Sequence, residues 1–166
     1  MTYTLIDSVT LTSSASSVTF SSISATGKGD LVAVWDVLSA SGSGTIQCEN
    51  RFNGDTGTNY NQVQMAGNGT STSSAASSSQ TRLRLFSGVR LTETIRALFI
   101  LQINDFSATD KHKSALGRGS GTNDELTAGA GRWASTSAIT SVTIQPTTAV
   151  SFAAGSTFHL YQIVSE

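Results

Sequence analysis

The chain is poor in the residue types that most sharply define a protein's class. It has one cysteine, Cys48, and one proline, Pro146, in 166 residues. A single cysteine excludes an internal disulfide framework and a cysteine-rich metal site, and it is compatible with a reducing cytosol. We therefore expect Cys48 to act as a small buried hydrophobe.

Charge is also scarce. Charged residues make up 13% of the chain, compared with about 25% in typical globular proteins. The formal net charge is −1, so the chain has no overall field to attract nucleic acid or an anionic membrane surface. We expect neither of these as a partner.

Long apolar runs are absent as well. No stretch of the sequence approaches the roughly 18 apolar residues that a membrane span needs. The N-terminal stretch MTYTLIDSVTLTSS lacks a basic region followed by an apolar run, so no secretory signal is predicted. We expect a complete small protein made in the cytoplasm of its host.

Small hydroxyl residues and glycine are abundant instead. The sequence contains 27 Ser, 23 Thr and 15 Gly. Ser and Thr compete for backbone hydrogen bonds inside a helix and Gly costs about 1 kcal/mol there, so strands and turns are favoured. The length suits one domain, residues 1–166.

Alternating hydrophobic residues predict a series of short strands. In the first, Leu5, Val9 and Leu11 share a face, which is typical of a half-buried strand. The stretch 30–38 is apolar on both faces, as in a central or core strand. The run 93–106 has helix formers, but the strict alternation from Ile95 to Ile103 favours a strand. The expected strands cover 4–12, 18–23, 30–38, 45–52, 82–86, 93–106, 138–145 and 156–164.

Polar segments separate these strands. The residues 67–80 (GNGTSTSSAASSSQ) and 107–131 are rich in Ser or Gly, and we expect both to be long mobile loops. FNGDTGTNY at 52–60 contains turn formers and predicts a surface loop or tight hairpin. The whole pattern predicts an all-β, antiparallel, jelly-roll-like sandwich of eight or nine strands.

Catalytic chemistry finds little support in the sequence. Asp55-Thr56-Gly57 matches the tripeptide of aspartic proteases, but it occurs once and follows Asn53-Gly54 where a protease needs an apolar strand. A turn aspartate is the favoured interpretation, with a homodimeric protease as the alternative. No GxSxG nucleophile motif occurs. We predict that the protein is not an enzyme.

Metal and cofactor binding are not predicted either. Oxygen ligands occur at Asp30, Asn53, Asp55 and Asn59, but their spacing does not match a calcium loop. His112 and His159 have no partner at metal-ligand spacing. We therefore expect no metal and no cofactor.

Four residues are candidates for an interface or recognition role: Asn53, Asp55, Tyr60 and Trp133. Trp133 lies where a glycine-rich segment enters a strand, so it either plugs the end of the sandwich or anchors a neighbouring subunit. Tyr60 has the same two interpretations. The local basic concentration of Arg82, Arg84, Arg90 and Arg96 predicts a solvated or subunit-facing surface, with phosphate binding as the alternative.

Four stretches together carry a resemblance. They are LIDSVTLTSSASSVTFSSI near the start, RFNGDTGTNY at 51–60, GRWASTSAITSVTI at 131–144 and SFAAGSTFHLYQIV near the end. In this order they resemble a widespread group of small virion proteins of tailed bacteriophages. The segments 67–80 and 107–131 do not take part in the resemblance.

The resemblance implies a structural role on the exterior of the virion, with no catalytic residues to transfer. A capsid decoration or cement protein would form a symmetric homo-oligomer, a trimer, over junctions of the major capsid protein. A tail or head fibre protein, which would bind a receptor or a host surface glycan, is the alternative. The absence of a heptad segment favours decoration, whereas long loops on a rigid scaffold would suit recognition. A carbohydrate-active enzyme or lectin is the third class, but the one adjacent acidic pair is Asp124-Glu125.

Overall fold

The computed structural model describes residues 2–24, 29–41, 47–86, 88–121, 125–147 and 150–164. The eleven strands are β1 (Thr2–Thr10), β2 (Val18–Phe20), β3 (Asp30–Val37), β4 (Cys48–Phe52), β5 (Tyr60–Gly67), β6 (Thr72–Gln80), β7 (Ala97–Ile103), β8 (Lys113–Ser120), β9 (Leu126–Trp133), β10 (Val142–Pro146) and β11 (Thr157–Val164). No helix occurs within the described ranges.

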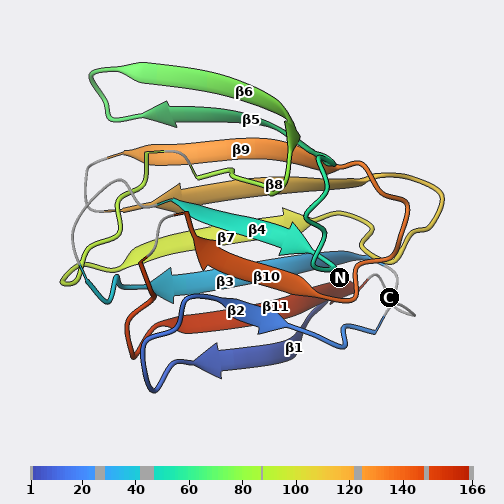
Figure 1. Ribbon diagram of the computed structural model, residues 1–166, viewed down its shortest axis with the longest axis horizontal. Coiled ribbons are helices and arrows are strands. Elements are labelled where there is room, and N and C mark those ends of the chain that lie inside the picture. Colours follow the sequence, from blue (N-terminus) through green and yellow to red (C-terminus); the bar gives the residue numbers. More distant parts are fainter. Residues whose placement is uncertain are drawn as a thin grey trace.

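These strands form the two sheets of an antiparallel sandwich, which confirms the predicted fold class (Figure 1). The large sheet has the order β1-β11-β3-β7-β8-β9-β5-β6 and the small sheet the order β2-β10-β4. Every neighbouring pair with a defined register is antiparallel. The division into eight and three strands is far more unequal than two matched sheets of a jelly roll.

The core lies between the inner face of the large sheet and the small sheet. Trp35 of β3 stacks on Phe99 of β7 with ring centroids 5.4 Å apart, and Phe86 meets Trp35 edge-on at 5.3 Å. The small sheet covers only part of the large one. The remaining inner face is covered by the segment around Leu83, Leu85 and Phe86, whose side chains are fully buried. Buried side chains of both sheets and of this segment make one hydrophobic cluster.

The strand expected at 93–106 is confirmed as β7. Ala97, Phe99, Leu101 and Ile103 are fully buried in alternation. Ile95, expected in phase with them, lies before the strand and is exposed. The alternation therefore predicted the type of element correctly and its beginning too early.

The expected mobile loop at 67–80 is wrong, because Thr72–Gln80 forms strand β6, which pairs with β5. Ser, Thr and Ala fill most of the strand, so its sequence has no apolar face from which a strand could be predicted. The backbone groups of every second residue bond to β5, and this pairing does not depend on side-chain hydrophobicity. A turn at Asn68 to Ser71 closes the hairpin, with Asn68 N donating to Ser71 O at 3.2 Å.

The expected loop at 107–131 is wrong for a different reason. It contains β8 and most of β9, and their glycines occupy positions on the inner face of the sheet. A Cβ on Gly117 would lie 2.8 Å from Phe86, and a Cβ on Gly131 would lie 2.2 Å from Leu83. These glycines let the segment that carries Leu83 and Phe86 lie directly on the strand backbone, so they indicate close packing instead of a loop.

The first strand carries a β-bulge. The register of β1 against β11 shifts between Leu5 and Asp7. Because one extra residue inverts the alternation of side chains, Leu5 faces solvent while Val9 packs against the core. Leu5 and Val9 were expected on one face, and the bulge is the reason they are not.

Three positions of interest in the sequence lie outside the described residues. They are Gly42–Gly44, where the glycines predict the end of a strand, Ile46, which is predicted to point inward, and Asp124 of the acidic pair.

Candidate functional site

The segment 53–59 connects the two sheets, because β4 belongs to the small sheet and β5 to the large one. The predicted turn is present: Asn53 and Gly54 have φ values of 54° and 66°, and Asp55 N donates to Phe52 O at 3.0 Å. Two successive positive φ angles with this hydrogen bond are typical of a type I′ turn. The turn directs the chain across the end of the sandwich, so the tight hairpin expected as one alternative is a crossover.

Asp55 is held by three N–H donors. Its Oδ2 accepts from the indole N–H of Trp133 at 2.6 Å and from Asn59 Nδ2 at 2.8 Å, and its Oδ1 accepts from Gly57 N at 2.7 Å. Burial works to raise the pKa of Asp55, but these hydrogen bonds outweigh it and hold the pKa below its ordinary value. Both carboxylate oxygens are therefore engaged within the chain, which fits a turn aspartate.

Tyr60 and Trp133 lie behind this turn and are buried. Their rings stack with centroids 6.4 Å apart, and Phe52 packs edge-on against Trp133 at 5.8 Å. Phe52 N donates to the Tyr60 hydroxyl at 3.1 Å, and burial raises the pKa of Tyr60 to about 12. This position agrees with the interpretation of Trp133 as a plug at the end of the sandwich.

Asn53 completes the cluster from the exposed side. Its Oδ1 accepts from the backbone N–H groups of Thr140 and Ser141 at 2.8 and 3.1 Å, and its Nδ2 donates to Ala138 O at 2.8 Å. The structure thus brings all four candidate residues together. Their polar groups bond to the protein itself, so the cluster ties the β4–β5 crossover to β9 and to the segment before β10, and a recognition role for it stays a prediction.

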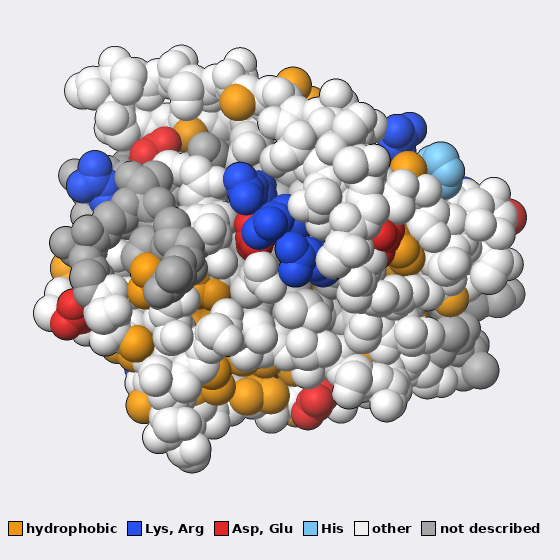
Figure 2. Space-filling view, in the orientation of Figure 1, with side chains coloured by type: hydrophobic (Ala, Val, Ile, Leu, Met, Phe, Trp, Pro, Cys, Tyr) orange, Lys and Arg blue, Asp and Glu red, His pale blue; other side chains and the backbone are white. Residues whose placement is uncertain are grey.

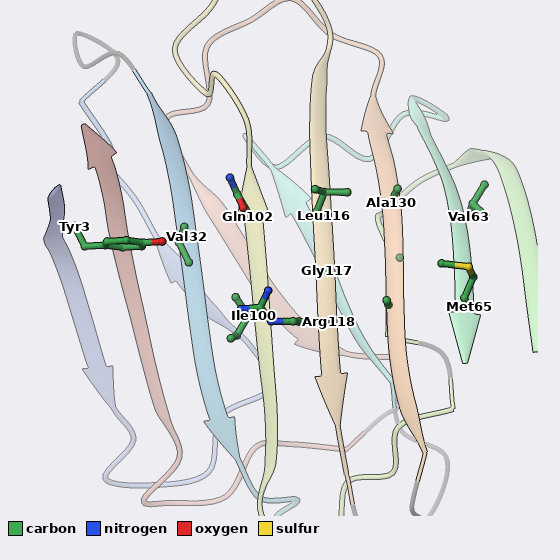
Figure 3. A pocket seen from close by; sticks show the side chains of 12 residues that line it. Tyr3, Val32, Val63, Met65, Ile100, Gln102, Leu116, Gly117, Arg118 and Ala130 are labelled. Carbon is green, nitrogen blue, oxygen red and sulfur yellow. The ribbon is translucent and has the colours of Figure 1, made fainter. Parts of the chain in front are cut away.

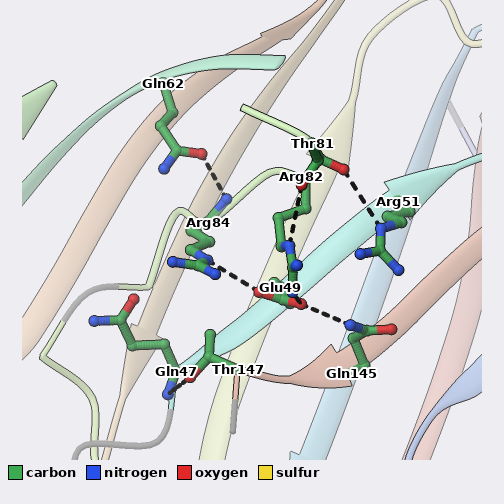
Figure 4. A network of polar contacts seen from close by, with 9 residues as sticks. All are labelled: Gln47, Glu49, Arg51, Gln62, Thr81, Arg82, Arg84, Gln145 and Thr147. Atoms are coloured by element: carbon green, nitrogen blue, oxygen red, sulfur yellow. Dashed lines mark hydrogen bonds and ion pairs between the residues drawn. The ribbon is translucent and has the colours of Figure 1, made fainter. Parts of the chain in front are cut away.

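A second polar cluster surrounds Glu49, which is fully buried (Figure 4). Arg82 Nη1 donates to Glu49 Oε1, Arg84 Nε donates to Oε2 at 2.9 Å, and Gln145 Nε2 donates to Oε1 at 2.6 Å. Figure 2 shows the basic side chains gathered over β4. The buried carboxylate is thus neutralised by arginines that remain partly in contact with solvent.

Sequence reasoning missed this cluster. In the strand expected at 45–52, the alternation of residues predicts that Glu49 lies on a polar face with Gln47 and Arg51. The segment carrying Arg82 and Arg84 crosses over that face and covers it. Of the four arginines singled out by sequence, only these two lie together. Arg96 instead reaches the carbonyls of Asp36 and Gly155, at 3.3 and 3.0 Å.

One face of the large sheet is turned away from the small sheet, and no contact among the described residues explains its many exposed apolar side chains. Seven large apolar side chains on it are between 46% and 66% exposed: Tyr3, Leu5, Val63, Met65, Leu98, Leu116 and Leu126. The pairing registers align Leu5, Tyr161, Val32, Gln102, Leu116, Ala130 and Val63 in one row across seven strands. We call this surface the outer face.

A shallow hollow of about 450 Å³ lies in the outer face (Figure 3). Figure 3 shows its lining side chains spread over the strands from Tyr3 on β1 to Met65 on β5. Arg118 is the one charged residue among the described residues that line it. The hollow is therefore apolar and nearly uncharged, and it is too open to enclose a small molecule. Around it, the register also places Asp30, Asp36 and Arg132 on the outer face.

One sequence signal pointed to the outer face. The strand at 30–38 was expected to be apolar on both sides, and in β3 the outward Val32 and Val34 are covered less completely than the inward Leu31 and Trp35. The remaining outward residues are scattered over β1, β5, β7, β8 and β9, so no single segment shows the face. It appears only when the register places them side by side.

Two further observations concern ligands and membranes. Within the described ranges, no group of three or more His, Cys, Asp or Glu side chains is placed to hold a metal ion. The same part of the chain contains no helix that could cross a membrane. Comparison with known protein families, with curated proteins and with solved structures finds no match for this chain.

Proposed function

We propose that this chain is a non-enzymatic structural protein of a tailed-bacteriophage particle, a capsid decoration or cement protein that stabilises the head as a symmetric homo-oligomer. The observation that carries the proposal is the outer face, with its seven exposed large apolar side chains. Contiguous exposed apolar surface of this extent is rare in proteins that act alone, and it marks sites of association.

The size of the outer face supports a protein partner. The eight strands of the large sheet are 7 to 9 residues long, and at spacings of about 4.8 Å and about 3.3 Å per residue they span roughly 900 Å². A specific interface of standard size buries about 800 Å² on each partner. One copy therefore offers enough surface for a complete interface without further elements.

The chemistry of the outer face supports the major capsid protein as that partner. A broad, weakly hollowed surface whose apolar hollow is lined by one charged residue, Arg118, suits flat packing on another protein, because each charge in such an interface would need a partner or would lose its hydration. A capsid repeats the same docking surface many times. Attachment by several copies in one oligomer would then be strong even where each contact is modest.

The fibre alternative rests on one specific observation. Tyr3 is exposed at one end of the hollow, and the polar side chains of Gln102 and Arg118 also line it. An exposed aromatic ring beside hydrogen-bonding groups could stack on a sugar. Tyr60 and Trp133, the two aromatic candidates for a recognition role, are buried and have no ring face free for such stacking.

The first experiment counts copies of the protein in purified phage by quantitative mass spectrometry, relative to the major capsid protein. A copy number close to that of the capsid subunit would establish decoration. A few to a few dozen copies would instead establish a fibre or tail component. Absence from purified particles would overturn both.

The second experiment tests the outer face itself. Leu116 lies on the outer face and is 52% exposed, whereas Ile95 lies outside the strands and is 58% exposed. We expect Leu116→Glu to abolish binding to heads that lack the protein and Ile95→Glu to leave it unchanged, with folding of both variants checked by circular dichroism. Wild-type binding by a folded Leu116→Glu variant would contradict the proposal.

A further inference from the structure

Strand β6 ends the large sheet on the side of β5, and among the described residues no strand pairs with its other side. Figure 1 shows it at the top edge of the sheet, beyond β5. Most of its residues are exposed whichever way their side chains point. The strand therefore covers almost no apolar surface and is held by its ladder to β5.

The backbone groups that β6 leaves free can be identified from the register. The bond from Asn68 N to Ser71 O closes the hairpin, so the hydrogen-bonded pairs follow at every second residue. These pairs are Ala66 with Ser73, Gln64 with Ala75 and Gln62 with Ser77. The alternate residues Thr72, Ser74 and Ala76 consequently direct their N–H and C=O groups away from β5.

Edge strands of natural proteins usually carry devices that prevent pairing with another chain, such as charges, prolines or bulges. The opposite edge strand, β1, has both a bulge and the charge of Asp7. Strand β6 is nine residues long and contains no charged residue and no proline. Its register against β5 shifts between Ser77 and Gln80, but it pairs regularly from Thr72 to Ser77. The regular stretch from Thr72 to Ser77 is therefore open to the addition of another strand, whereas the edge of β1 is interrupted by its bulge and by Asp7.

We propose that β6 pairs antiparallel with β6 of a second copy about a two-fold axis, which joins two large sheets into one of sixteen strands. Two identical antiparallel strands are self-complementary, so such a contact closes on itself. An uncharged strand meets its copy without like-charge repulsion, and Ser and Thr side chains of facing strands can hydrogen-bond across the junction. The small side chains on both faces let the two edges approach to the ordinary strand spacing.

This contact concerns assembly of the chain with itself and does not depend on a role in a phage. A trimer, as expected from the sequence, would have to join through another surface, and β6 pairing would then link two trimers. The two outer faces would continue into each other across the junction.

The variant Ser74→Pro tests the proposal on the isolated full chain. It removes one outward N–H that β5 does not use, and proline is tolerated on an edge strand at such a position. The control Ser74→Thr keeps the N–H. By analytical ultracentrifugation at high protein concentration, we expect wild type and Ser74→Thr to share an even-numbered assembly and Ser74→Pro to have half its mass.

Amide hydrogen exchange gives a second readout that does not rely on a variant. In the assembled wild-type protein, the amides of Thr72, Ser74 and Ala76 should exchange at least about tenfold more slowly than that of Gly69 in the adjoining turn. Their protection should fall on dilution. Unprotected amides in an assembled protein would overturn the proposal, as would a wild-type mass for a folded Ser74→Pro variant.

Other occupants of the edge give distinct results, each of which also overturns the two-fold contact. A wild-type monomer at high concentration would show that β6 does not pair with a second copy. Open-ended growth with new protection along β1 would show head-to-tail pairing of β6 with β1. Because no capsid is present, these outcomes are independent of the proposed virion role.

Discussion

The indole N–H of Trp133 donates a 2.6 Å hydrogen bond to Oδ2 of Asp55, a residue 78 positions earlier in the chain. Trp133 ends β9 of the large sheet, and Asp55 lies in the crossover from the small sheet. The bond thus ties the two layers together at one end of the sandwich. Its acceptor is charged and its donor is almost completely buried, so it is of the kind that contributes most among hydrogen bonds.

Asp55→Asn should destabilise the protein, because the amide replaces one acceptor oxygen with a donor that faces other donors. We expect a loss of about 1–3 kcal/mol, typical of an unsatisfied buried polar group. Thermal unfolding followed by tryptophan fluorescence measures it. The exposed Asp110→Asn is the matched control and should lie within about 0.5 kcal/mol of wild type.

The same carboxylate predicts an acid dependence. The hydrogen bonds lower the pKa of Asp55 in the folded state, so the unfolded chain binds its proton more tightly. The stability that Asp55 contributes is therefore complete above the unfolded pKa of about 3.9 and is lost as the pH falls through the lower folded pKa. Urea unfolding of wild type and Asp55→Asn between pH 7 and pH 2 should show the gap closing in acid. A gap that stays constant would contradict the assignment.

Glu49→Gln should destabilise the protein more than removal of an exposed ion pair. The neutral amide leaves Arg82 and Arg84 without their shared carboxylate, and both arginines are only partly exposed. We expect a loss of about 1–3 kcal/mol by chemical denaturation. Asp36→Asn, which removes the exposed pair with Arg96 at 3.7 Å, should cost about 0–1 kcal/mol. Equal effects of the two substitutions would show that the Glu49 cluster contributes no more than a surface pair.

Gly131→Ala should be costly, since the added Cβ would lie 2.2 Å from Cδ1 of the fully buried Leu83. Overpacking of this kind costs about 1–3 kcal/mol. The control is Gly67→Ala in β5, where the nearest atoms would lie 3.6 Å away, an ordinary contact. Differential scanning calorimetry should show a clear fall in Tm for Gly131→Ala only. Equal Tm values for the two variants would contradict the close packing of Leu83 on Gly131 of β9.

Cys48 should not react with thiol reagents in the folded protein. Burial raises the pKa of its thiol to about 12, so about one thiol in ten thousand would be ionised at pH 8 even if the reagent had access. Labelling with a chromogenic disulfide should be negligible in native buffer and stoichiometric in denaturant. Rapid native labelling would show that β4 opens on its own.

The sequence was a good guide wherever side-chain alternation carried the information. β3, β7 and β11 are confirmed with the expected type, because each alternates inward apolar residues over a full strand. Periodicity is a local property, and it survives whatever the partner strands are. The buried state expected for Cys48, as the single cysteine of the chain, is also confirmed.

The sequence failed where backbone pairing or close approach replaced hydrophobic contrast. Strand β6 has no apolar face, and the glycines of β8 and β9 resemble a loop until the segment around Leu83 and Phe86 is placed on top of them. The position of Glu49 depended on that same covering segment. Each of these features is a relation between parts far apart in the chain, which composition alone does not report.

The four candidate residues show the same limit. The turn at Asn53 and Gly54 was predictable from its residue types, whereas the bond between Asp55 and Trp133 was not, since nothing in the sequence aligns the two positions. The outer face needed the register of seven strands before its residues became neighbours.

The placement of β11 between β1 and β3 has a consequence for synthesis on the ribosome. The pairing of Thr2 with Val164 and of Thr10 with Thr157 is the only ladder that holds β1 among the described strands. Strand β1 must therefore wait, unpaired, until Thr157–Val164 has left the exit tunnel. At about 5–20 residues per second, that wait lasts roughly 8–30 seconds. A nascent chain arrested before β11 would leave both β1 and β3 open to other chains, so the large sheet is not complete until β11 has been translated.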